Sequence, residues 1–181
     1  MKYKTSRRTF LAGLAGAVTA TSLGGAADAS MIVPQSRTLS FNNLHTGENA
    51  TLQYWADGQY IPAALKEVDF ILRDYRNGEI HPIEPRLLDL LSQLHANVES
   101  ARPFEVISGY RSAATNAMLH EAGRGAASKS LHMQGQAIDI RLADCALTDL
   151  HTAAVRLRLG GVGFYPGSNF VHVDVGRVRY W

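Results

Sequence analysis

Two histidines and one aspartate form a candidate ligand set in the C-terminal third of the chain. His132 and Asp139 stand seven positions apart, and His172 follows about thirty residues later. Two neutral imidazoles and one carboxylate suit Zn²⁺, and three protein ligands leave the fourth tetrahedral position to water. This is the composition of a catalytic rather than a structural zinc site, so these residues predict metal-assisted hydrolysis.

The spacing between His132 and Asp139 requires the chain to reverse. Seven extended residues would cover roughly 23 Å, which is too far for two ligands of one ion. Gly135 lies between them and can adopt the backbone conformations that a tight turn needs. We therefore expect a turn at Gly135.

The segments 137–142 and 170–175 alternate between apolar and polar side chains, as strands do. Asp139 lies on the polar face of the first segment, and His172 and Asp174 share the polar face of the second. A single His or Asp in such a place is usually structural. The combination is more specific, because two strands would present their polar faces to one cleft.

This combination resembles the signature of the zinc D-Ala-D-Ala carboxypeptidases and related peptidoglycan endopeptidases of the hedgehog-like metallopeptidase fold. That signature reads Ser-x-His-x-x-Gly-x-Ala-x-Asp with a later His, and it is matched by Ser130, His132, Gly135, Ala137, Asp139 and His172. The resemblance implies zinc ligation by His132, Asp139 and His172. It covers roughly residues 60–181, and the chain's ending is similar to the murein endopeptidase K-like branch.

A second segment, Ser108-Gly-Tyr-Arg111, looks like the Ser-Gly-Tyr-Arg segment of the same family. The resemblance implies that Arg111 lies in the active cleft and contacts the carbonyl or carboxylate of the substrate. Tyr110 and Ser130 are predicted to bind substrate beside it. Tyr165 could also line the cleft, although nothing in the sequence requires it.

The sequence departs from the family at the position of the general base. Many members carry Glu or Asp three residues before the final His, whereas this chain has Asn169. Asp174 is the predicted substitute, because it shares a strand face with His172 about 7 Å further along. Metal-bound His also commonly donates its other N–H to a carboxylate. Asp174 is thus either the base or the residue that orients His172.

The N-terminus resembles a twin-arginine export signal. Ser6-Arg-Arg-Thr-Phe-Leu11 precedes a stretch rich in Ala, Gly and Leu, and Ala27-Asp-Ala29 offers small residues for cleavage. The apolar stretch is weaker than the roughly 20 strongly apolar residues of a membrane span. We expect export by the twin-arginine translocation machinery to the periplasm and cleavage before Ser30.

Charge and cysteine content exclude several classes of protein. The formal net charge is +2, but residues 1–29 carry four basic residues and one acidic residue, so the mature chain is near −1. No run of Lys or Arg argues for nucleic acid. The single Cys145 excludes an intramolecular disulfide and a cysteine-based zinc site.

The predicted fold class is α+β, with a small antiparallel sheet that carries the zinc site and is flanked by helices. Residues 1–29 are the predicted signal peptide, 30–59 an N-terminal extension or hairpin, and 60–181 the zinc peptidase domain. Apolar spacing predicts four helices, which begin at Pro62, Pro85, Ala113 and Thr148.

The predicted function is hydrolysis of peptide cross-links in peptidoglycan by a zinc-dependent murein endopeptidase. The stem peptides of peptidoglycan would be its substrate, and an adaptor or regulatory protein would be a further partner. Three alternatives stay open: a DD-carboxypeptidase, a non-catalytic zinc-containing peptidoglycan-binding module, and a purely structural metal site.

Overall fold

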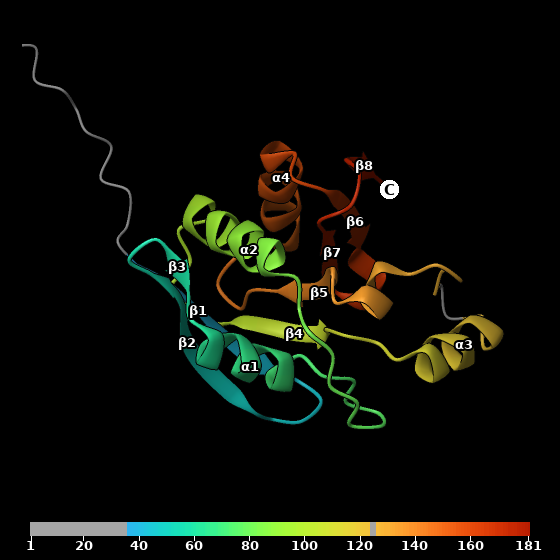
Figure 1. Ribbon diagram of the computed structural model, residues 1–181. Helices are drawn as coiled ribbons and strands as arrows, with labels where there is room; N and C mark the ends of the chain where they lie inside the picture. The colour runs from blue at the N-terminus through green and yellow to red at the C-terminus, as the bar shows by residue number, and fades with distance from the viewer. Residues whose placement is uncertain (1–35, 124–125) are drawn as a thin grey trace, which may run out of the picture. The chain divides into compact units, whose positions relative to one another are not determined.

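The computed structural model describes residues 36–123 and 126–181 (Figure 1). The predicted export signal in residues 1–29 lies outside the described residues. In chain order the elements are β1 (Ser36–Asn43), β2 (Asn49–Ala56), β3 (Gln59–Tyr60), α1 (Pro62–Ile71), α2 (Pro85–Asn97), β4 (Phe104–Ser108), α3 (Ala113–Glu121), β5 (Ala137–Arg141), α4 (Leu147–Leu157), β6 (Gly161–Tyr165), β7 (Phe170–Asp174) and β8 (Arg179–Tyr180). None of the described helices is long and apolar enough to cross a membrane.

The strands form one mixed sheet in the order β3-β2-β1-β4-β5-β7-β6-β8. The α+β class is confirmed, but the prediction of a small antiparallel sheet is wrong, because the sheet that the described residues form has eight strands and includes two parallel pairs. The neighbours β4, β5, β7 and β6 are antiparallel to one another. The site strands therefore pair antiparallel, as expected, inside a larger sheet.

The parallel pairs arise from connections that local sequence patterns do not reveal. The predicted hairpin forms, with β1 antiparallel to β2, and β1 then pairs in parallel with β4. The helices α1 and α2 lie in the connection between this hairpin and β4, so the chain returns to start β4 in the same direction as β1. At the other end, β8 pairs in parallel with β6. One sheet thus runs from the hairpin to the C-terminal strand.

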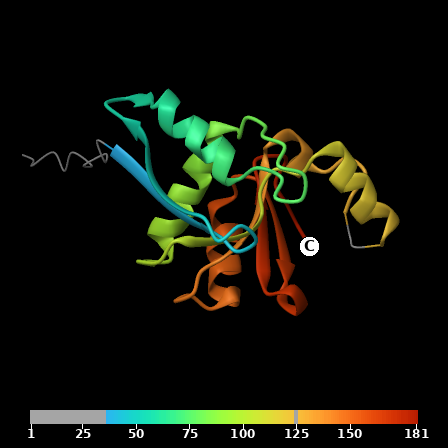
Figure 2. The same cartoon turned by 90° about the horizontal axis from the view of Figure 1, so that it is seen from below.

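One face of the sheet packs into the hydrophobic core, and the other carries the polar side chains of the site. Apolar side chains of β1, β4, β5 and β7 join the buried leucines of α2 and Leu150 of α4 in one hydrophobic core. The helices α2 and α4 contact each other and pack on β1 and on β6 and β7, respectively. Figure 2 shows α3 on the other side of the C-terminal strands from α4. The polar positions of β5 and β7 are therefore free to build a site on the face away from α4.

The helix that begins at Pro62 is shorter than the apolar spacing of Leu65, Val68, Leu72 and Tyr75 predicts. It ends at Ile71, and the backbone carbonyl of Leu72 accepts a hydrogen bond of 2.7 Å from the backbone N–H of Tyr110. A Cβ atom on Gly109 would collide with the same carbonyl. The close approach of Leu72 and Gly109 thus joins the end of α1 to the segment that carries Arg111.

The turn predicted at Gly135 is present. Residues Leu131–Gln134 form a short 3-10 helix, and Gly135 follows in the left-handed region with φ 64°. A Cβ atom there would collide with the carbonyl oxygen of Pro82, and the carbonyl of Gly135 accepts the N–H of Glu84. The turn is therefore packed against the chain as well as sharply bent.

Replacing Gly135 with Ala should destabilise the protein more than the same change at Gly78. Gly78 also has a positive φ, 77°, but open space surrounds its Cβ position. We expect Gly78→Ala to lower the free energy of unfolding by about 1 kcal/mol. Gly135→Ala should cost a further ~2 kcal/mol, because the backbone must move. Equal losses for the two variants in urea denaturation would show that the Pro82 contact is unimportant.

Candidate active site

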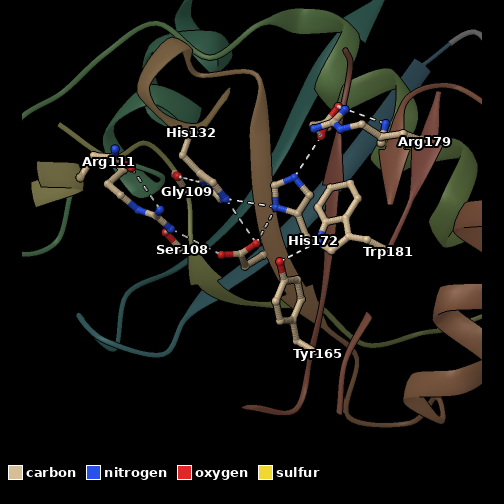
Figure 3. Close-up of polar contacts among 12 residues, drawn as sticks. Ser108, Gly109, Arg111, His132, Tyr165, His172, Arg179 and Trp181 are labelled. Atoms are coloured by element: carbon tan, nitrogen blue, oxygen red, sulfur yellow. Dashed lines mark hydrogen bonds and ion pairs between the residues drawn. The ribbon is translucent and has the colours of Figure 1, made fainter. Parts of the chain in front are cut away.

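Three predicted ligands converge at the meeting point of β5, β7 and the 3-10 turn. The Nε2 atom of His132 lies 3.2 Å from Nδ1 of His172 and 3.3 Å from Oδ1 of Asp139, and the last two atoms are 2.8 Å apart (Figure 3). Asp139 and His172 are direct partners in the β5–β7 register. The three residues are at most 9% exposed.

This arrangement fits a tetrahedral metal ion. Two ligand atoms about 2.0–2.1 Å from a zinc ion, at a tetrahedral angle, are about 3.3 Å from each other. The three separations of 2.8–3.3 Å agree with that value to within a small relaxation. Among the described residues, His132, Asp139 and His172 form a group that could hold a metal ion.

A backbone carbonyl orients His132. Its Nδ1 donates to the carbonyl of Gly109 at 2.7 Å, which leaves Nε2 with the free electron pair of a neutral imidazole. The N–H of Arg111 also donates to the carbonyl of His132. The Ser-Gly-Tyr-Arg segment thus fixes the tautomer and the position of a ligand, which the sequence analysis did not foresee.

Asp174 orients the second imidazole. Its Oδ2 accepts from Nε2 of His172 at 3.0 Å, on the side of the ring opposite to Nδ1. The same carboxylate accepts hydrogen bonds from the backbone N–H groups of Gly161 and Gly176 and from both terminal nitrogens of Arg179. It is fully buried, and these five donors occupy it. Of the two roles that the sequence left open for Asp174, the geometry favours orientation of His172 over proton acceptance.

The ligand side chains also shift one another's pKa values. Burial alone would raise the pKa of Asp139, but His132 and His172 keep it well below its usual value. Burial would lower the pKa of His172, whereas its contacts with Asp139 and Asp174 raise it to about 9. The cluster without metal is therefore held together by a protonated His172 between two carboxylates.

Arg111 lies beside the ligands with its hydrogen-bonding capacity little used. Its terminal nitrogens are 3.4 Å from Asn116 Oδ1, 3.4 Å from Ser108 Oγ and 3.7 Å from Asp139 Oδ2. Its Nε is buried and has no partner among the described residues. Ser112 caps the helix α3 directly after it, which fixes the backbone at this point. Because the contacts of its terminal nitrogens are long, the guanidinium can bind a better-placed acceptor in the cavity.

The three ligands open into a cavity of about 240 Å³. Arg111 and Ser130 line it, as predicted, and so does Tyr165. Tyr110 does not: it is buried, and its hydroxyl donates to Glu79 at 2.6 Å. Asn169 also lies elsewhere, exposed at the start of β7 and lining a different hollow. The residue three positions before His172 therefore does not face the ligands.

The C-terminal residues contribute to the site, although no sequence pattern indicated that they would. Arg179 pairs with Asp174, and Trp181 lies beside His172 with ring centroids 5.3 Å apart. Both residues line the cavity. A local pattern could not find them, because a two-residue strand such as β8 has no periodicity to read.

A buried His-Asp-His group that opens into a cavity is the arrangement of a metallohydrolase centre. A sequence profile of the family described as peptidoglycan L,D-endopeptidase MepK matches residues 31–181, and the chain belongs to this family. The resemblance read from the motifs is thereby confirmed, and with it the class of peptidoglycan endopeptidases.

Two relatives agree with this assignment, and one solved structure shows a remote similarity. The Escherichia coli (strain K12) peptidoglycan L,D-endopeptidase MepK is 41% identical over 180 residues, which are 99% of each chain. A Haemophilus influenzae protein described as a probable peptidoglycan L,D-endopeptidase MepK is 42% identical over 149 residues, 82% of this chain and 80% of its own. The crystal structure of Serratia marcescens L-Ala D-Glu endopeptidase ChiX is 20% identical, covers 52% of this chain and 68% of its own, and gives a TM-score of 0.36.

Replacing Asp174 with Asn distinguishes its two candidate roles. If Asp174 orients His172, zinc affinity should fall about tenfold to a hundredfold, as measured by competition with a chromophoric chelator. If Asp174 acts only as the base, zinc affinity should stay unchanged while turnover is lost. Circular dichroism of the variant establishes that the fold is retained.

Zinc affinity of the metal-stripped protein should rise with pH. Below a pKa of about 9 His172 is protonated, and the proton must leave before Nδ1 can bind metal. The apparent affinity should therefore increase about tenfold per pH unit from pH 7 to 9 and then level off. Calorimetric titration in buffers of different ionisation enthalpy should detect the released proton, and an affinity independent of pH would contradict the assignment.

Proposed function

We propose that this chain is a zinc-dependent endopeptidase that cleaves L,D peptide cross-links in peptidoglycan. The single observation that carries the proposal is the convergence of His132 Nε2, Asp139 Oδ1 and His172 Nδ1 within 3.3 Å of one another. The L,D specificity is supported by the names of relatives that match nearly the whole chain. Zinc, when bound, activates water as a nucleophile near neutral pH and polarises the scissile carbonyl.

The chain's own residues position the reacting groups. Gly109 and Asp174 hold the two imidazoles so that their ligand nitrogens face Asp139. Arg111 holds the carbonyl or carboxylate of the stem peptide through its terminal nitrogens, whose contacts within the chain are 3.4 Å or longer. Ser130 lines the same cavity and offers a hydroxyl to the substrate backbone.

The cavity has a charge suited to an acidic substrate. Besides Asp139 and Tyr165, its ionisable lining residues are His132, His172 and the basic residues Arg111, Lys129 and Arg179. A bound Zn²⁺ would add further positive charge. Peptide stems that carry free carboxylates would be attracted to such a cavity.

We also propose that the chain acts in the periplasm after export by the twin-arginine translocation machinery. The support is the segment Ser6-Arg-Arg-Thr-Phe-Leu11 and the small residues before Ser30. Deleting residues 1–29 should leave the protein in the cytoplasm. Replacing Arg7 and Arg8 with Lys should have the same effect if the paired arginines are the signal.

Digestion of purified peptidoglycan tests the proposed activity. Mature, zinc-loaded protein should remove L,D-linked muropeptide dimers and spare D,D-linked ones, as read by mass analysis of the released fragments. A chelator or the variant His132→Ala should abolish the loss, because either removes the metal centre. Trimming of terminal residues alone would instead indicate a carboxypeptidase, and sacculus binding without cleavage would indicate a binding module.

A further inference from the structure

Tyr165 lines the cavity, and the proposed function leaves its hydroxyl unused. It ends β6, and the register places Gly163 opposite His172 and Tyr165 opposite Phe170. Because side chains alternate along a strand, Tyr165 lies on the same face of the sheet as His172. Its ring stacks on Phe170 with centroids 4.6 Å apart. Figure 3 shows its hydroxyl directed towards the ligand cluster.

Trp181 fixes the direction of that hydroxyl. The indole Nε1 donates to the Tyr165 oxygen at 2.7 Å. Indole N–H is a donor only, so the tyrosine hydroxyl must accept this bond and keeps its own hydrogen for another acceptor. That hydrogen has no acceptor within the parts of the chain that the structure describes. The Tyr165 hydroxyl therefore lines the cavity with a hydrogen-bond donor that is available to a bound substrate.

The indole contacts three residues of the site, while Trp181 as a whole stays 49% exposed. A Cβ atom on Gly163 would come within 2.8 Å of the Trp181 ring, so the absence of a side chain there makes room for it. The guanidinium of Arg179 lies 4.8 Å from the ring centroid, and the ring of His172 lies 5.3 Å away on the site side. The same Arg179 pairs with Asp174. Trp181 is thus built into the surroundings of the ligand His172.

We propose that Tyr165 is a catalytic residue that donates a hydrogen bond to the oxygen of the scissile carbonyl as negative charge develops on it, and that Trp181 is its positioning residue. This inference rests on the proposed function. A fixed donor aimed at developing charge in a partly closed site stabilises the transition state more than the ground state. The energetic benefit depends on the hydroxyl being oriented before the reaction, which the indole N–H provides.

Arg111 does not fill this role by itself. Figure 3 shows Arg111 on one side of the ligand cluster and Tyr165 with Trp181 on the other. One terminal nitrogen of Arg111 lies 3.7 Å from Asp139 Oδ2, which keeps the guanidinium on the β5 side of the cluster. A substrate lying across the ligands would thus meet one donor on each side.

The variant Tyr165→Phe tests the proposal, since it keeps the stacked ring and removes only the hydroxyl. With a purified L,D-linked muropeptide dimer we expect kcat to fall about a hundredfold or more, with KM changed little. Affinity for a phosphinate peptide, which mimics the developing oxyanion, should fall in parallel. Zinc affinity should be unchanged. The matched control is Tyr180→Phe, whose hydroxyl bonds Val155 outside the cavity and whose loss should leave kcat unaltered.

The positioning role of Trp181 is tested by a double-mutant cycle. Trp181→Phe should lower kcat about five- to tenfold in the wild-type background and have no further effect in Tyr165→Phe. Equal losses in both backgrounds would show that Trp181 acts only by packing and would overturn its assignment. A wild-type kcat in Tyr165→Phe would overturn the catalytic role while the proposed function stands. Failure of the wild-type protein to cleave the dimer would instead refute the function itself.

Discussion

Burial of a carboxylate between two imidazoles is the interaction on which the rest of this structure depends. Asp139 lies under the cavity within 3.3 Å of both ligand nitrogens. An isolated ionised carboxylate in such a place costs several kcal/mol. The cost is offset by the positive charge that His172 retains, or by a metal ion in its place. Every nearby partner either supplies positive charge or restricts the direction in which a ligand points.

The same strands that hold this cluster also build the hydrophobic core, which explains how the ligands are kept in register. Ile138 and Ile140 flank Asp139, and Val171 and Val173 flank His172, all four fully buried on the opposite face. A slip of one residue between β5 and β7 would move ligands into the core and apolar residues into the cavity. Core packing and site geometry therefore require the same register between β5 and β7. The β-bulge between Val106 and Ser108 then brings Ser108 opposite Asp139, within reach of Arg111.

Sequence reasoning succeeded where the signal was local and failed where it depended on distant contacts. Alternation in 137–142 and 170–175 predicted both site strands and their faces, and the spacing around Gly135 predicted the turn. The end of α1 was missed because the N–H of Tyr110, far along the chain, binds the carbonyl of Leu72. The size of the sheet was missed because β1 joins β4 only through a long connection. The placement of Tyr110 away from the cavity also depends on a distant contact. Its hydroxyl donates a hydrogen bond to Glu79, thirty-one residues earlier in the chain.

Among the described residues, no carboxylate besides Asp139 lines the cavity, which changes how this site must work. Asp139 is the only acid that lines the cavity within the described part of the chain, and Asp174 is fully occupied by donors behind His172. An acidic residue at position 169 would not supply the base from this backbone, because Asn169 lies exposed beside Glu105 and Arg141 in another hollow. The cavity is rich in donors and positive charge instead. In the proposed endopeptidase, hydrolysis would therefore depend more on donors such as Tyr165 and Arg111, which stabilise negative charge at the scissile carbonyl, than on a carboxylate base in the cavity.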